Sequence, residues 1–145
     1  MTFSKIRYAD LKGKGKQQEI YNFQKVSAVL ADYGFCTIKL NDDWKGADFL
    51  ADHFSKSITL RVQLKSRFSI AKKYSNKQIY MCFPIFDRWC LVPHDYLITL
   101  VDETSPYLSS KPWREKGEYH SEKGNQKLRT LLEPHMLVGD WDPYL

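Results

Sequence analysis

Hydrophobic and polar positions change period several times along the chain, and each period predicts a different element. Between Gln17 and Tyr33 apolar side chains recur every three or four residues, which is typical of an amphipathic helix, and Gly34 is a natural stop. The apolar positions of this helix are Ile20, Phe23, Val26, Leu30 and Tyr33. Glu19 begins the same inward-facing stripe, where a carboxylate is unusual for a plain core helix.

Short apolar stretches after this helix alternate or run continuously, as strands do. They predict strands over residues 35–40, 47–52, 57–66, 77–85 and 88–92, with a turn at Asn41–Asp43 after the first. The stretch 77–85 is apolar almost throughout and suits a buried central strand. Short helices are expected from Pro93 to about Val101, and from Gln126 to Glu133 with Pro134 as the stop.

The order of helix, antiparallel strands and helix predicts an α/β fold with one twisted sheet. At 145 residues the chain is expected to form a single domain, with a core over residues 16–101 and a C-terminal extension over 102–145. Within that extension, residues 102–127 are polar, and their prolines and glycines are expected to break any regular element. Trp141–Tyr144 is expected to form a packed tail.

Charge and cysteine content narrow the class of protein. A formal net charge of +5 favours a polyanionic partner. Cys36, Cys82 and Cys90 each lie in an apolar run without zinc-site spacing, so buried, reduced thiols are expected. Neither a signal-peptide pattern nor a run of 18 apolar residues is found, which predicts a soluble, cytoplasmic protein with no membrane partner.

Candidate chemistry gathers on the stretch Thr59–Arg67. Leu60, Val62 and Leu64 share one side of the predicted strand, and Thr59, Arg61, Gln63 and Lys65 share the other. Asp48 lies on the preceding strand, where it can meet Gln63 across neighbouring strands. An acid, an amide and a lysine in this arrangement suit phosphodiester hydrolysis, which needs a cation with oxygen ligands, an oriented water and neutralised charge.

Specific ligand roles follow from that chemistry. Asp48, Gln63 and the backbone carbonyl of Leu64 are candidate ligands of Mg²⁺ or Mn²⁺. Lys65 is the candidate group that orients or helps to deprotonate water, and Glu19 is expected to reach the same site from the first helix.

Two basic segments are candidate nucleic-acid contacts. Lys12, Lys14 and Lys16 alternate with glycines, either as a solvated arm or as a segment that follows a DNA backbone. Residues 111–120 mix cations such as Arg114 with aromatic residues, which suits backbone contact and base stacking. The favoured interpretation of this second segment is structural, with Trp113 and Tyr119 holding a long loop on the core. His94 and Asp95 are expected to cap the helix that follows Pro93.

Glu19, then Asp48 preceded by Gly46, and then the run Val62–Arg67 together resemble the PD-(D/E)xK nuclease superfamily. The archaeal Holliday-junction resolvases and related restriction-endonuclease-like proteins are the most similar branch, over roughly residues 16–101. The resemblance implies a restriction-endonuclease-like core, with a central mixed β-sheet flanked by helices. It also implies a metal-dependent endonuclease that acts on DNA, with branched or sequence-specific targets, and a homodimer.

The resemblance assigns roles residue by residue. Asp48 matches the metal-binding aspartate, Lys65 the catalytic lysine and Glu19 the first-helix glutamate of some branches, and Arg67 is a candidate phosphate contact. Gln63 occupies the position that is usually acidic, and it offers one neutral oxygen in place of a carboxylate. The alternatives are a catalytically weakened module of the same fold that binds DNA or protein, and a ribonuclease. Ala47 replaces the name-giving proline, from which little follows.

Overall fold

A mixed five-stranded sheet lies at the centre of the computed structural model, which describes residues 1–139 except for the side chains of Asp43 and Trp44. Its strands, in spatial order, are β1 (Phe35–Trp44), β2 (Ala47–His53), β3 (Thr59–Leu64), β5 (Ile79–Ile85) and β6 (Arg88–Pro93). β3 and β5 run parallel, and the other neighbours run antiparallel. The expected α/β class with a mixed sheet is therefore confirmed.

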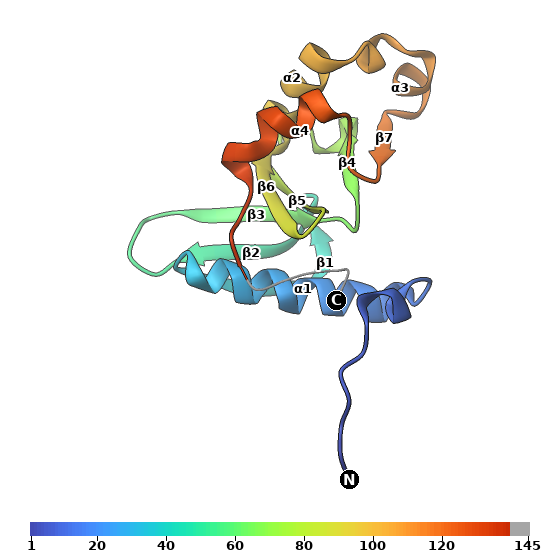
Figure 1. The fold of residues 1–145 in the computed structure, drawn as a ribbon. Helices are drawn as coiled ribbons and strands as arrows, with labels where there is room; N and C mark the ends of the chain where they lie inside the picture. Colours follow the sequence, from blue (N-terminus) through green and yellow to red (C-terminus); the bar gives the residue numbers. More distant parts are fainter. Residues whose placement is uncertain (140–145) are drawn as a thin grey trace.

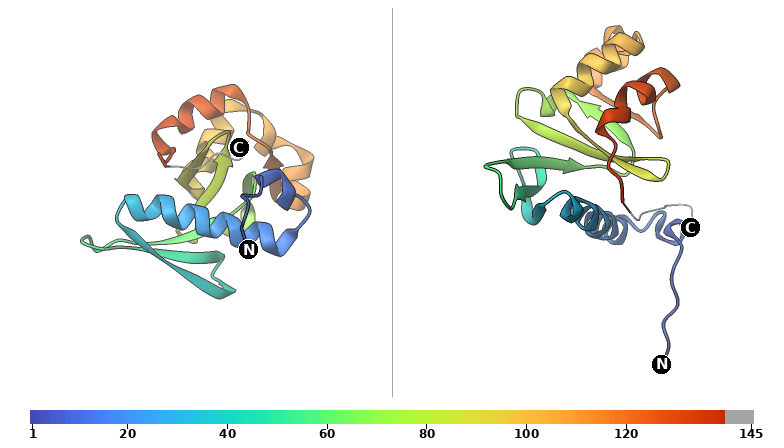
Figure 2. Two further views of the ribbon diagram at one scale, coloured as in Figure 1. Left: turned by 60° about the horizontal axis from the view of Figure 1, so that its bottom comes forward. Right: turned by 60° about the vertical axis from the view of Figure 1, so that its left-hand side comes forward.

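Helices cover both faces of this sheet (Figures 1 and 2). α1 (Gly15–Asp32) lies on one face, and α2 (His94–Thr104) and α4 (Gln126–Leu132) lie on the other. Because side chains alternate along a strand, β6 sends Trp89 to the α1 side and Cys90 to the α2 side. The predicted positions of all three helices are confirmed, with ends that differ by a few residues.

A second, two-stranded sheet joins β4 (Phe68–Ala71) to β7 (Glu118–Ser121), so the prediction of one sheet was wrong. α3 (Lys111–Lys116) precedes β7, so residues 102–127 also contain regular elements. Pro112 and Gly117 bracket α3 instead of breaking it. Proline is tolerated in the first turn of a helix, and Gly117 ends it in the left-handed region at φ 66°. Residues 1–139 also contain single-turn 3₁₀ helices: η1 (Tyr8–Leu11), η2 (Lys72–Tyr74), η3 (Tyr107–Ser109) and η4 (Glu133–His135).

The turn of the first hairpin lies further along the sequence than the composition predicts. β1 continues through Asn41–Asp43 to Trp44, and the two turn residues are Lys45 and Gly46, with φ of 52° and 86°. Positive φ at both central positions matches the right-handed twist of two-residue hairpins. The turn-prone residues Asn41–Asp43 are instead accommodated where the β1–β2 register shifts, between Lys39 and Trp44.

The C-terminal extension takes part in the main core. Trp113, Leu128 and Leu132 are buried in the same cluster as residues of β5, β6 and α2. Cys82 and Cys90 are buried as expected, but Cys36, on the edge strand β1, is exposed. Among residues 1–139, no helix has the length and apolar character needed to cross a bilayer. The tail expected at Trp141–Tyr144 lies outside the described residues.

Candidate active site

The residues predicted to carry chemistry line one pocket, where β3 ends beside the first turns of α1. The pocket has a volume of about 340 Å³. α1, β1, β2 and β3 all contribute to its wall, as do the two residues that follow β3. Its lining residues are Gly15, Gln18, Glu19, Asn22, Lys39, Asp48, Gln63, Leu64, Lys65 and Ser66.

Asp48 and Gln63 meet across β2 and β3, as predicted. The register that pairs Phe49 with Val62 places Asp48 opposite Gln63 when it is continued by one residue. The Asp48 carboxylate also accepts a hydrogen bond from the backbone N–H of Leu64, with an N–Oδ2 distance of 2.9 Å. This bond holds the carboxylate against the end of β3, because the side chain takes the place of a ladder partner.

Gln63 carries an unsatisfied oxygen. Its side chain is 7% exposed, and its Oε1 is buried with no hydrogen-bond partner among the described residues. A buried carbonyl oxygen without a partner costs about 1–3 kcal/mol of stability. Because Gln63 lines the pocket, rotation of its side chain would present this oxygen to a ligand bound there.

Two lysines line the pocket with their ammonium groups over aromatic rings. Lys65 Nζ lies 5.7 Å from the ring centroid of Tyr74, and Lys39 Nζ lies 5.2 Å from that of Phe23. The backbone of Lys65 is fixed by an N–H that donates to the Cys82 carbonyl of β5 at 2.8 Å. Ring faces attract cations without neutralising them, so both charges remain available to an anion in the pocket.

The α1 side of the pocket is more polar than the sequence predicted. Glu19 is exposed rather than inward-facing, but it lines the pocket. Asn22 is buried, and its Oδ1 accepts a hydrogen bond of 3.0 Å from the Tyr8 hydroxyl, which itself accepts one from Gln18. Asn22 lies four residues before the buried Val26 and therefore falls on the apolar stripe of the helix. A polar residue on that stripe was the sequence signal that could have identified Asn22 as part of the site. For Lys39, the strand pattern gave no such signal.

Comparison of the chain with protein-family models, with curated proteins and with solved structures gives no match.

The oxygen ligands of the pocket, rather than its net charge, suit a divalent cation. Glu19 and Asp48 are carboxylates and Lys39 and Lys65 are ammonium groups, so the formal charges cancel and a phosphate alone gains little attraction. A divalent cation would make the pocket positive, and the oxygens of Asp48, Glu19 and Gln63 are of the type that Mg²⁺ prefers. Among the described residues, no group of three or more His, Cys, Asp or Glu can hold a metal ion. The fit therefore depends on the Gln63 amide oxygen, with weaker binding than a third carboxylate would give.

The predicted nucleic-acid contacts do not all lie at the pocket. Lys12, Lys14 and Lys16 are exposed beside Gly15, a pocket residue at the start of α1. Arg67, the candidate phosphate contact, is exposed three residues beyond the end of β3 at Leu64 and does not line the pocket. Arg114 is exposed on α3, on the other side of the sheet from α1.

His94 and Asp95 form no helix cap, contrary to expectation. His94 is fully buried, and its Nε2 accepts a hydrogen bond of 3.2 Å from the Ala71 N–H of β4. Asp95 accepts one of 3.0 Å from the Asn76 N–H. Both side chains thus satisfy free amides, but these amides lie in β4 and in the loop before β5.

Proposed function

We propose that this chain is a metal-dependent endonuclease that hydrolyses DNA phosphodiester bonds, with a restriction-endonuclease-like core. The observation that carries the proposal is the convergence of Glu19, Asp48, Gln63 and Lys65 on one pocket. These residues come from α1, β2, β3 and the segment after β3. A solvated strand face gives no reason for an amide oxygen to be buried without a partner beside a carboxylate.

Asp48, Gln63 and the Leu64 carbonyl would hold Mg²⁺ or Mn²⁺, with Glu19 assisting from α1. Such an ion acts as a Lewis acid on the phosphate and offsets the negative charge that develops during hydrolysis. The bond between Leu64 N–H and Asp48 keeps one carboxylate oriented before any ligand arrives. Pre-orientation of this kind lowers the cost of reorganisation during the reaction.

Lys65 positions the attacking water and stabilises negative charge on the phosphate oxygens. Its ammonium group is held at the Tyr74 ring, and its backbone is fixed to β5, so the charge stays at the pocket wall. Glu19, which is exposed at the pocket, accepts a hydrogen bond from the water. Removal of a positioned proton-transfer or charge-stabilising group typically costs about 100-fold or more in rate.

Plasmid cleavage tests this proposal. Purified wild-type protein with Mg²⁺ should nick or linearise supercoiled DNA, and excess chelator should stop it. Asp48→Asn and Lys65→Ala should each lower the rate by about 100-fold or more. Lys56→Ala removes an exposed lysine in the β2–β3 loop and should leave the rate unchanged.

A binding measurement separates the metal site from catalysis. Titration with Mn²⁺, followed by electron paramagnetic resonance, should show a site that is lost in Asp48→Asn and kept in Lys65→Ala. Equal cleavage by wild type and Lys65→Ala, together with no Mn²⁺ site that depends on Asp48, would exclude the proposed mechanism. Preference for structured RNA in parallel incubations would redirect the proposal to a ribonuclease.

The neutral amide of Gln63 favours a second candidate function, a DNA-binding or protein-interaction module of the same fold that has lost catalysis. One amide oxygen binds a divalent cation more weakly than a carboxylate does. If wild type does not cut DNA but Gln63→Glu does, the chain is a degraded nuclease.

We further propose that the protein acts as a homodimer, because a two-fold axis gives one site for each DNA strand. Light scattering during size-exclusion chromatography should give twice the chain mass of 17.1 kDa.

A further inference from the structure

Tyr74 connects the pocket to a second basic region. Its ring is buried at 3% exposure, and the ammonium groups of two lysines lie over it. Lys65 Nζ lies 5.7 Å from the ring centroid, and Lys73 Nζ lies 5.2 Å from it. Lys65 lines the pocket, whereas Lys73 belongs to η2 and is exposed. A row of lysine side chains therefore runs from the pocket onto the neighbouring surface.

A similar contact extends this basic region to α3. Lys72 Nζ lies 5.6 Å from a ring centroid of Trp113, and the Lys72 N–H donates to the Gly117 carbonyl at 2.8 Å. A Cβ at Gly117 would come within 3.1 Å of the Lys72 side chain, so the lysine stem lies directly against the end of α3. α3 contributes two further exposed lysines, Lys111 and Lys116.

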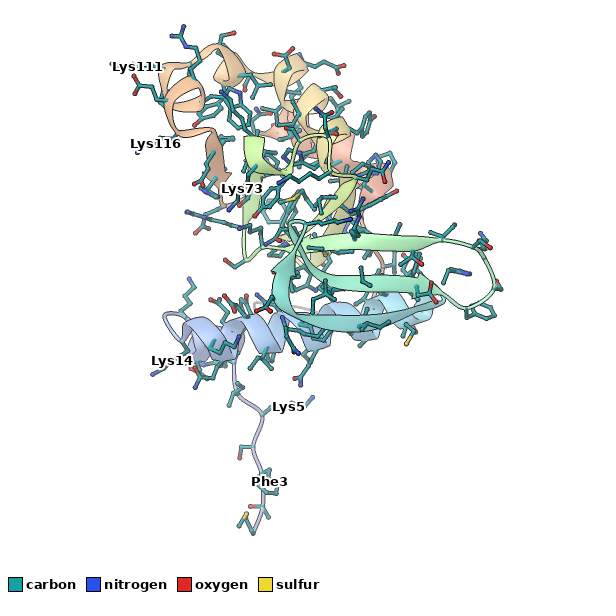
Figure 3. The ribbon with its side chains drawn as sticks, turned by 180° about the vertical axis from the view of Figure 1, so that it is seen from behind. Phe3, Lys5, Lys14, Lys73, Lys111 and Lys116 are labelled. Carbon is teal, nitrogen blue, oxygen red and sulfur yellow. The ribbon has the colours of Figure 1, made fainter. Side chains whose placement is uncertain are left out.

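Lys72, Lys73, Lys111 and Lys116 are called the lysine ridge. Figure 3 shows Lys73, Lys111 and Lys116 on the same side of the molecule as Lys14, which precedes α1. Lys111 Nζ lies 3.7 Å from Glu115 Oε1. This ion pair is exposed, so it offsets little of the lysine charge. Within the described part of the chain, Lys72, Lys73 and Lys116 form no ion pair. Lys72 and Lys73 lie over rings, and exposed cations gathered on one side of a molecule are typical of a surface for a polyanion.

We propose that the lysine ridge binds the phosphate backbone of the same DNA duplex whose scissile phosphate enters the pocket. This inference rests on the proposed function. Contacts to phosphates carry no sequence information, so the ridge fixes the position of the duplex without selecting its sequence. It gives the C-terminal extension a role in substrate binding, because α3 carries half of the ridge lysines.

Salt-dependent binding without divalent metal tests the ridge apart from catalysis. Fluorescence anisotropy of a labelled DNA duplex is measured in chelator over a range of salt concentrations. For wild type, the logarithm of the association constant should fall steeply with the logarithm of the salt concentration. The double variant Lys73→Gln/Lys116→Gln should reduce that slope by about 1.8, since each phosphate contact contributes about 0.9. At about 0.1 M salt this corresponds to a dissociation constant raised by roughly 60-fold.

The matched control is Lys56→Gln/Lys127→Gln, which removes two exposed lysines from the β2–β3 loop and α4. It should keep the wild-type slope. Equal slopes for the ridge and control variants would overturn the proposal. So would a ridge variant that weakens binding of double-stranded RNA but not of DNA.

Cleavage assays distinguish failure of the ridge from failure of the proposed function. The ridge variant should raise KM for the duplex about tenfold or more and leave kcat unchanged, because no ridge residue lines the pocket. If wild type binds DNA through the ridge but never cuts it, the ridge stands and the endonuclease proposal fails. If the ridge variant cuts and binds as wild type does, the endonuclease proposal stands and the ridge fails.

Discussion

Gln63 is the residue on which the chemistry of the pocket depends. Its amide is buried opposite Asp48 on β2, and its oxygen has no partner among the described residues. An amide there avoids the repulsion between a buried carboxylate and the half-buried Asp48 carboxylate on the neighbouring strand. The same choice weakens the attraction for a divalent cation, so stability without metal and affinity for metal change in opposite directions at this position.

Gln63→Glu should therefore destabilise the metal-free protein and strengthen metal binding. A carboxylate buried beside Asp48 should lower the free energy of unfolding by about 2–5 kcal/mol in chelator. Saturating Mg²⁺ should restore most of that loss, because a ligand that binds the folded state stabilises it. Thermal denaturation with and without Mg²⁺ measures both effects. Gln24→Glu, at an exposed position of α1, should leave the stability unchanged both with and without Mg²⁺.

His94 gives the fold a dependence on pH that does not involve the pocket. Burial lowers its pKa below the ordinary value of 6.5, and the Asp95 carboxylate opposes that shift. The neutral ring also accepts the Ala71 N–H at Nε2, and a proton on that nitrogen would turn the acceptor into a donor. Below about pH 6.5 the unfolded chain takes up a proton that the folded chain resists, so acidification favours unfolding.

The free energy of unfolding should accordingly fall as the pH drops from about 7 towards 5, and His94→Gln should make this fall shallower. Glutamine keeps an oxygen that can accept the Ala71 N–H, but it cannot be protonated. Urea denaturation at several pH values gives the comparison, with His135→Gln in η4 as the matched control. An unchanged pH slope in His94→Gln would show that other groups carry the acid sensitivity.

Among the elements, those with a long and regular period could be predicted, and they carry most of the site. α1, β2 and β3 hold Glu19, Asp48 and Gln63, and the periods of the two strands predicted that Asp48 and Gln63 meet. The helical period placed Glu19 facing inward, whereas it is exposed at the pocket. Lys39 joins the pocket from β1, next to the register shift, and no local pattern specifies such a shift. β4 and β7 were missed because each has only four residues and pairs with a partner far away in the sequence.

The β1–β2 turn is an element whose backbone affects the site through Tyr74. Gly46 adopts φ 86°, and a Cβ added there would lie 3.3 Å from the Tyr74 ring. Gly46→Ala should lower the free energy of unfolding by about 1–2 kcal/mol, through left-handed backbone strain and crowding of that ring. Gly15→Ala, where a Cβ meets nothing within 4 Å, should leave stability nearly unchanged in the same urea titration.

At the scale of the molecule, the C-terminal extension completes the face of the sheet that α1 does not cover. α4 lies beside α2 on that face, and Leu128 and Leu132 are buried with Leu97 and Val101 of α2. Arg88 of β6 also donates two hydrogen bonds to Glu133, at 2.7 and 2.8 Å. The first 101 residues alone would expose the apolar side of α2, and such surfaces are not left to solvent in stable domains.

Two neighbouring leucines of α4 test this dependence. Leu132 is fully buried and Leu131 is 37% exposed, although both belong to the last turn of the same helix. Leu132→Ala should lower the free energy of unfolding by about 2–5 kcal/mol, because it leaves a cavity against α2. Leu131→Ala has the same effect on helix propensity and should cost less than about 1 kcal/mol. If both variants unfold at the same urea concentration as wild type, the extension contributes nothing to the core. A single cooperative transition in the wild type, shifted as a whole by Leu132→Ala, would instead show that the sheet and the extension unfold together.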